Sequence, residues 1–132
     1  INVGGGTIFG PKPRDFSYSI PKKEKRLAMM TILSSHAQGD RLTVVEDFTV
    51  ESGKTKDLVA ILNNFAKDER TVLILKDDDA KIKQAARNVK NLTFLTYNRL
   101  EAHDLYYGRK VIVLESAIAN LTKFYSDDKE AK

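Results

Sequence analysis

Gly53, Lys54 and Thr55 form the tripeptide that ends a phosphate-cradling loop in nucleotide-hydrolysing proteins. That loop also needs a glycine five residues before Gly53, because its backbone must bend closely around the phosphates. Phe48 occupies this position. We therefore interpret Thr55 as the N-cap of a helix rather than as a phosphate ligand.

The glycine-rich start of the chain also fails as a cofactor loop. Gly4 and Gly6 begin the pattern of dinucleotide-binding loops, but Phe9 stands where the third glycine belongs. No strand precedes the glycines, so the structural context of the motif is missing as well. The sequence predicts no cofactor.

The two histidines do not predict catalysis. His103 and Asp104 are adjacent, and adjacent residues on a helical turn are expected to point away from each other. The sequence places no nucleophile near them. His36 falls near the end of a predicted helix, where an imidazole suits the terminal carbonyls. We predict that the chain is not an enzyme.

Asp77, Asp78 and Asp79 follow a predicted strand, at the edge where α/β proteins bind ligands. A hard cation could bind there. A loop with a helix N-cap explains the run as well. The alternative function is thus a small α/β ligand-binding or enzymatic domain that uses the strand ends near Asp47, Asp77 and Asn98.

The net charge of +4 lies entirely in the first fifth of the chain. Residues 1–26 hold six basic and two acidic residues, whereas the remaining 16 basic and 16 acidic residues cancel. Such a strip is expected where a protein faces a polyanion, although a solvated charged end would look the same.

The basic residues around the start of a predicted helix favour the polyanion. Lys22, Lys23, Lys25 and Arg26 crowd the positive end of the helix dipole, where each cation costs about 0.3 to 1 kcal/mol. Helix stability does not explain them, whereas an external phosphate does. In the preceding segment, Phe9, Phe16 and Tyr18 alternate with Lys12 and Arg14, a mixture suited to stacking on bases and pairing with phosphates. Packing of these aromatic rings on the domain's own core remains an equal alternative.

Hydrophobic periodicity predicts the elements that must position these residues. Residues 1–20 hold four of the seven glycines and two of the three prolines and show no hydrophobic period, so we expect an extended basic arm. A globular domain over 21–132 should follow. It should begin with a helix over 21–38 whose stripe is Leu27, Met30, Leu33 and Ala37 and which stops at Gly39. Predicted strands cover 42–46, 71–75, 93–97 and 110–114, and predicted helices or turns cover 54–67, 79–89, 101–107 and 116–125, with a frayed tail over 126–132.

Three of the four predicted strands are nearly continuous apolar runs, and the strands alternate with helices. This pattern predicts an α/β fold with a mainly parallel sheet of about four strands, flanked by helices. Val72, Ile74, Val111 and Val113 should be buried together. The chain has no cysteine and no apolar run of roughly 20 residues, so we expect neither disulfides nor a membrane span, and a cytoplasmic location.

Several motifs resemble the ribosomal protein L-four family. The run GGGTIFGPKPRDFSY over residues 4–18, followed by IPKK over 20–23 and KRLA over 25–28, is similar to the segment where that family's long loop enters its globular domain. Lys54-Thr55-Lys56, Ala86-Arg87-Asn88 and Asp104-Leu105 resemble the same family in the same order. The resemblance covers nearly the whole chain. It implies that an outgoing arm and loop tip would precede Ile1, and we expect an N-terminal truncation.

The resemblance implies a structural constituent of the large ribosomal subunit, bound to ribosomal RNA and to neighbouring ribosomal proteins. Some members also bind their own messenger leader. The expected RNA-binding residues are Phe9, Lys12, Arg14, Phe16, Tyr18, Lys22, Lys23, Lys25 and Arg26. If Lys22, Lys23 and Arg26 contact phosphates, their replacement by Gln should leave folding intact or slightly improved.

Overall fold

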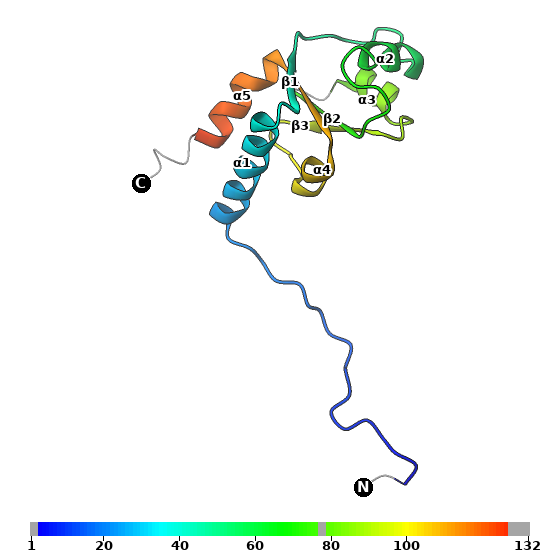
Figure 1. Cartoon of the computed structure of the whole chain (residues 1–132), viewed down its shortest axis with the longest axis vertical. Coiled ribbons are helices and arrows are strands. Elements are labelled where there is room, and N and C mark those ends of the chain that lie inside the picture. The colour runs from blue at the N-terminus through cyan, green and yellow to red at the C-terminus, as the bar shows by residue number, and fades with distance from the viewer. Residues whose placement is uncertain (1–2, 77–78, 127–132) are drawn as a thin grey trace.

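The computed structural model describes residues 3–76 and 79–126, which form a single parallel sheet flanked by helices (Figure 1). The predicted α/β class is confirmed. The sheet has the order β1-β4-β2-β3, and all of its neighbouring strands are parallel. The strands are β1 (Leu42–Val45), β2 (Thr71–Leu75), β3 (Leu92–Thr96) and β4 (Lys110–Leu114). The helices are α1 (Lys22–Gln38), α2 (Thr55–Leu62), α3 (Ala80–Ala86), α4 (Ala102–Tyr107) and α5 (Glu115–Ser126).

The helices cover both faces of the sheet. α2 packs against α3 and α1 packs against α4, while Figure 1 shows α1 and α5 across the sheet from α2 and α3. The connections through α2 and α3 lead from β1 to β2 and on to β3, toward one edge of the sheet, whereas the connection through α4 leads back from β3 to β4. Because α4 also lies on the other face of the sheet from α2 and α3, all three β-α-β crossovers have the same handedness, as parallel βαβ units require. No helix among the described residues is long and apolar enough to cross a membrane.

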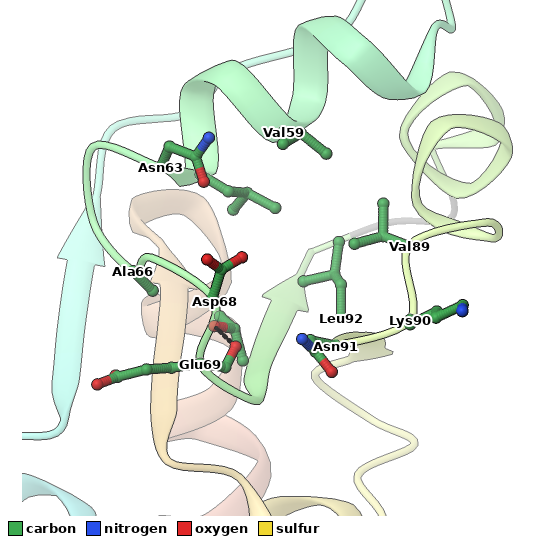
Figure 2. A pocket seen from close by; sticks show the side chains of 11 residues that line it. Val59, Asn63, Ala66, Asp68, Glu69, Val89, Lys90, Asn91 and Leu92 are labelled. Carbon is green, nitrogen blue, oxygen red and sulfur yellow. Dashed lines mark hydrogen bonds between the residues drawn. The ribbon is translucent and has the colours of Figure 1, made fainter.

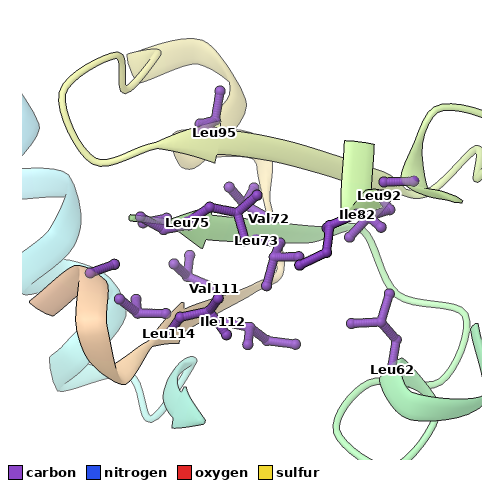
Figure 3. Close-up of a cluster of buried hydrophobic side chains, with 14 of the residues drawn as sticks. Leu62, Val72, Leu73, Leu75, Ile82, Leu92, Leu95, Val111, Ile112 and Leu114 are labelled. Atoms are coloured by element: carbon purple, nitrogen blue, oxygen red, sulfur yellow. The ribbon is translucent and has the colours of Figure 1, made fainter. Parts of the chain in front are cut away.

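β2 is the centre of the core and is buried along its whole length (Figure 3). Val72 pairs in register with Val111, and Ile74 pairs with Val113. All four side chains are at most 3% exposed, so their predicted common burial is confirmed. The edge strand β1 is only partly covered, and Val44 is 50% exposed. The continuous apolar runs thus marked the strands that are covered on both faces.

The predicted buried stripe of α1 is wrong at three of its four residues. Leu27 and Met30 are 64% and 40% exposed, and Ala37 is exposed as well. The buried residues of α1 are Met29 and His36, with Leu33 partly buried between them. The helix is rotated from the predicted orientation, and a histidine, which the apolar pattern leaves out, lies on its inner face.

His36 contacts α4 rather than the end of its own helix. Its Nε2 lies 2.6 Å from the carbonyl oxygen of Leu105, so Nε2 carries the proton and donates. That carbonyl has no acceptor role within α4, because the amide of Arg109 donates to Arg70 and the amide of Gly108 donates to Asp104. The imidazole therefore satisfies an orphan carbonyl at a helix end and links α1 to α4.

α1 ends as predicted at Gly39, but Asp40 takes the left-handed conformation, with φ 52°. The amide of Arg41 donates to His36 and that of Asp40 donates to Ala37. These two bonds form a Schellman motif, in which a glycine more often occupies the left-handed position.

The other helices differ from prediction mainly at their ends. α2 and α3 stop at Leu62 and Ala86, several residues before the predicted limits. α2 begins at Thr55 with Lys54 as its N-cap, so the predicted capping role of Thr55 is wrong. Ser126 is the last residue of α5 rather than the first of a tail, and residues 127–132 lie outside the described residues.

Gly108 marks a close approach between the end of α4 and the core. A Cβ atom added there would lie 2.8 Å from Cγ2 of Val72 and 3.2 Å from the carbonyl oxygen of Asp104. Since Val72 is 1% exposed, its methyl group has no room to move. We expect Gly108→Ala to lower the free energy of unfolding by about 1–3 kcal/mol, as overpacking does. Urea unfolding followed by circular dichroism would show this, and an unchanged midpoint would contradict the close contact.

Candidate nucleic-acid interface

Residues 3–20 form no helix or strand and extend away from the domain (Figure 1). Gly4 and Gly5 have φ of 85° and 88°, a region in which a residue with a Cβ atom is strained. Nearly every described residue of this arm is exposed. The arm therefore presents both its backbone and its side chains to whatever surrounds it.

The aromatic residues of the arm do not pack on the domain. Phe9, Phe16 and Tyr18 are 102%, 73% and 84% exposed. The guanidinium of Arg14 lies 4.3 Å from the centroid of the Phe16 ring, so a cation and an aromatic face are presented together. Lys12 is exposed as well. Packing on the core, the alternative that the sequence left open, is not the arrangement of the described arm.

One carboxylate interrupts the basic arm, and it is held locally. Oδ1 of Asp15 accepts a hydrogen bond of 2.9 Å from the backbone amide of Ser17. This bond, together with a second one from the Ser17 hydroxyl, lowers the pKa of Asp15 below its usual value. The carboxylate turns toward its own backbone in an Asx-type turn that spans Phe16.

We expect the arm to be mobile in the absence of RNA. It has no core of its own, and among its described residues the structure records only the local contacts of Arg14 and Asp15. Backbone order parameters from ¹⁵N relaxation should fall below about 0.6 between Gly4 and Arg14, against about 0.85 in α1. The prediction extends to Ile1 and Asn2, which lie outside the described residues. Rigid amides across Gly4 to Arg14 in the free protein would contradict it.

Lys22, Lys23 and Lys25 lie on the first turns of α1 and are exposed. Pro21 is the N-cap and provides no side-chain hydrogen bond, so the positive helix end is uncapped. Within the described part of the chain, none of the three lysines makes a side-chain hydrogen bond or ion pair. Their charges are therefore neither required by the helix nor neutralised by these residues.

Arg26 follows these lysines along α1 but, unlike them, it packs against α5. It is half-buried, and its guanidinium lies 5.2 Å from the centroid of the Phe124 ring in α5. Replacing Arg26 therefore removes a contact between two helices as well as a charge. The prediction that Gln at this position leaves folding intact does not fit this packing.

Two acidic residues that follow strands, where the alternative hypothesis placed a ligand, cap helices instead. Oδ1 of Asp47 accepts from the amide and the hydroxyl of Ser116, at 3.2 and 2.9 Å, at the start of α5. Asp79 caps α3 by accepting from the amides of Lys81 and Ile82, as the alternative interpretation predicted. Asn98 lies elsewhere, beside α1, and Asp77 and Asp78 lie outside the described residues. Among the residues that the structure describes, no three metal-binding side chains cluster.

His103 and Asp104 approach more closely than predicted, with Nδ1 3.6 Å from Oδ1. Their side chains lean together at the start of a short exposed helix, where the imidazole also packs against Tyr107. The histidine side chain is 73% exposed and that of Asp104 is 22% exposed, so the pair lies at the surface. The contact is a surface ion pair when His103 is protonated, and its contribution to stability is small.

A hollow beside the amino-terminal ends of β2 and β3 is unsuited to binding phosphate (Figure 2). Asp68 and Glu69 lie on one side of it, and Lys90 and Asn91 lie on the other. The hydroxyl of Thr71 donates to the carbonyl of Glu69, and the amide of Thr71 donates to that of Asn91. Two carboxylates beside a single lysine would repel a polyanion.

Another hollow includes residues that the sequence did not single out. Asn98, Phe124 and Tyr125 lie beside Lys22, Lys25 and Arg26, where the start of α1 meets the end of α5. Their positions in the chain are 72 or more residues away from Arg26. No local sequence signal could have connected them, because only the tertiary fold brings them together.

Comparison with known proteins agrees with the family resemblance. A family model described as "Ribosomal protein L4/L1 family" matches residues 1–124. The large ribosomal subunit protein uL4 of Treponema denticola is 75% identical over 123 residues, which cover 93% of this chain and 58% of that protein. The uL4 proteins of Treponema pallidum and Borrelia duttonii are 67% and 53% identical, with 93% of this chain and 57% and 60% of theirs covered. The chain thus spans less than two thirds of the length of these relatives. It belongs to the ribosomal protein L4/L1 family.

Proposed function

We propose that the chain is a structural constituent of the large ribosomal subunit that binds ribosomal RNA through its arm and the start of α1. The observation that supports this most strongly is the group of three lysines at the positive end of α1, which lack partners among the described residues. Their charges raise the energy of the free protein and would be stabilised by phosphate. The relatives are named as large ribosomal subunit proteins, which agrees with such a partner.

The proposed contact has two parts with different chemistry. Lys22, Lys23 and Lys25 would neutralise phosphates on a folded surface, which positions the domain without reading the sequence. The arm would contribute Phe9, Phe16 and Tyr18 for stacking, and Lys12 and Arg14 for further phosphates. Through these contacts the chain would aid assembly and translation.

The proposal includes the surroundings of the protein. On the ribosome, in the cytoplasm, neighbouring ribosomal proteins would be further partners, and the messenger leader of its own operon is a second candidate RNA. The chain would act by binding and shaping RNA and not by catalysis.

Binding of a large-subunit ribosomal RNA fragment, measured across a salt series, tests the proposal. The logarithm of affinity should fall linearly with the logarithm of salt concentration, by about 0.9 per duplex phosphate neutralised. Heparin, a polyanion without bases, serves as the control ligand. Weak binding with a flat salt dependence would refute the proposal, and so would equal affinity for heparin and RNA at matched charge.

A further inference from the structure

The hollow between α1, the segment after β3 and the end of α5 combines cations, aromatic rings and an amide. Its volume is about 270 Å³, just below the range of roughly 300–1,000 Å³ typical of pockets for drug-sized ligands. It therefore suits one small planar group better than a large ligand. We call it the Asn98 hollow, and its polar and aromatic lining residues are Lys22, Lys25, Arg26, Asn98, Phe124 and Tyr125.

The electrostatics of the Asn98 hollow favour an anion. Three of its lining residues are cations, and none of those that the structure describes there is a carboxylate. Lys22 and Lys25 are exposed at its rim, where their ammonium groups can reach a phosphate in solvent. This composition is the opposite of the acidic hollow beside Asp68 and Glu69.

The aromatic part of the hollow provides stacking surfaces. Phe124 and Tyr125 are half-buried, with ring centroids 5.2 Å apart and planes at 86°, and Phe124 forms a second T-shaped pair with Tyr97. Arg26 lies over Phe124, so a planar guanidinium and an aromatic ring lie together at the hollow, and a base can stack on either kind of group. Burial raises the pKa of Tyr125, although Arg26 opposes the shift, so its hydroxyl remains a hydrogen-bond donor at neutral pH.

Asn98 adds a group that can read the edge of a base. Its amide carries two donor hydrogens and an acceptor oxygen, and the residue is exposed at the rim of the hollow. A base in a duplex cannot use such a site, because its faces are stacked and its Watson–Crick edge is paired. An unpaired base can use both the stacking surface and the amide.

We propose that the Asn98 hollow binds one unpaired nucleotide of RNA, with its base on the Arg26 and Phe124 stack, its edge at Asn98 and its phosphate at Lys22 and Lys25. The assignment rests on the proposed function, since it takes RNA as the partner. It adds a site on the folded domain that distinguishes looped or bulged RNA from a duplex. The lysines alone would not make this distinction.

The test uses the whole chain with two probes, a short single-stranded RNA of mixed sequence and the blunt duplex made from it. Asn98→Ala should weaken single-strand binding by roughly two- to tenfold, the effect of one hydrogen bond. Phe124→Leu should weaken it by roughly five- to 150-fold, the effect of one stacking partner. Both variants should leave duplex affinity and the salt slope unchanged. Asn64→Ala, which changes an exposed amide beyond α2, is the matched control and should bind both probes as the unaltered chain does.

Each outcome separates this site from the proposed function. Wild-type single-strand affinity in Asn98→Ala and in folded Phe124→Leu would overturn the Asn98 hollow, while salt-dependent binding by the unaltered chain would preserve the proposed function. Equal losses for the single strand and the duplex would also overturn it. Binding of neither RNA by the unaltered chain would refute both. If thermal unfolding shows that Phe124→Leu does not fold, Asn98→Ala decides alone, because the Asn98 side chain is exposed and forms no hydrogen bond with the other described residues.

Discussion

Replacing Ile74 by Asp is expected to abolish folding. Ile74 is 0% exposed at the centre of the sheet, between Val113 on β4 and Leu95 on β3. The change removes a large apolar side chain, at about 2–5 kcal/mol, and adds a polar group without a partner, at about 2–7 kcal/mol. Together these losses match the whole stability of an ordinary domain, about 5–15 kcal/mol. Circular dichroism should show an unfolded chain without denaturant.

The sheet itself provides the control for this variant. Val44 lies in the same register row as Val113 and Ile74, but on the edge strand β1, and it is 50% exposed. We expect Val44→Asp to fold and to lose only about 1–2 kcal/mol of unfolding free energy, because its carboxylate can reach water. A cooperative transition of Ile74→Asp at the wild-type urea midpoint would refute the assignment of β2 as the central strand.

Replacing Lys22, Lys23 and Lys25 together by Gln is expected to weaken RNA binding without weakening the fold. The three lysines stand at the positive end of the α1 dipole, so their removal should leave the free energy of unfolding unchanged or raise it by about 0.3–1 kcal/mol per residue. Each lost phosphate contact should flatten the slope of log affinity against log salt by about one. Preference among RNA sequences should change little, because phosphates carry no base identity. RNA affinity should thus fall while stability stays the same or rises.

A charge-matched variant separates local contacts from net charge. Lys56, Lys67 and Lys81 are exposed in and beside α2 and α3, across the sheet from α1, and their joint replacement by Gln removes the same three charges. We expect the steep salt slope to persist in this control. If both triple variants lose the same affinity, the lysines of α1 act only through net charge. Arg26→Gln belongs in the series as a contrast, because loss of its stack on Phe124 should lower stability and affinity together.

The sheet could be predicted from the sequence, whereas the inner face of α1 could not. β2 and β4 read as apolar throughout because helices cover both of their faces. In α1, two apolar stripes interleave, and the buried one ends on His36, which a hydrophobic pattern counts as polar. Its burial depends on the carbonyl of Leu105, 69 residues away in the chain. No local pattern contains that partner.

Part of the candidate site could likewise be predicted from the sequence and part could not. The lysines of α1 could be identified from the sequence, because a helix dipole and a run of like charges are local properties. Arg26 is also a cation in the first turns of α1, yet its side chain packs against α5. That difference depends on the rotation of α1 against α5, which the exposed positions of Leu27 and Met30 also reflect. The same rotation places Asn98 and Phe124 beside the lysines.

The strand order has a consequence for how the protein is made. β4 is the last strand to be synthesised, and it lies between the first two, with Val111 beside Leu42 on one side and Val72 on the other. β1 has no partner in the sheet until β4 leaves the ribosome that is translating it. At about 5–20 residues per second, this interval lasts several seconds. The basic arm and the first turns of α1 precede β1 in the chain, so they leave the ribosome before β4 does. The proposed RNA-binding segment therefore reaches the solvent before the sheet is complete.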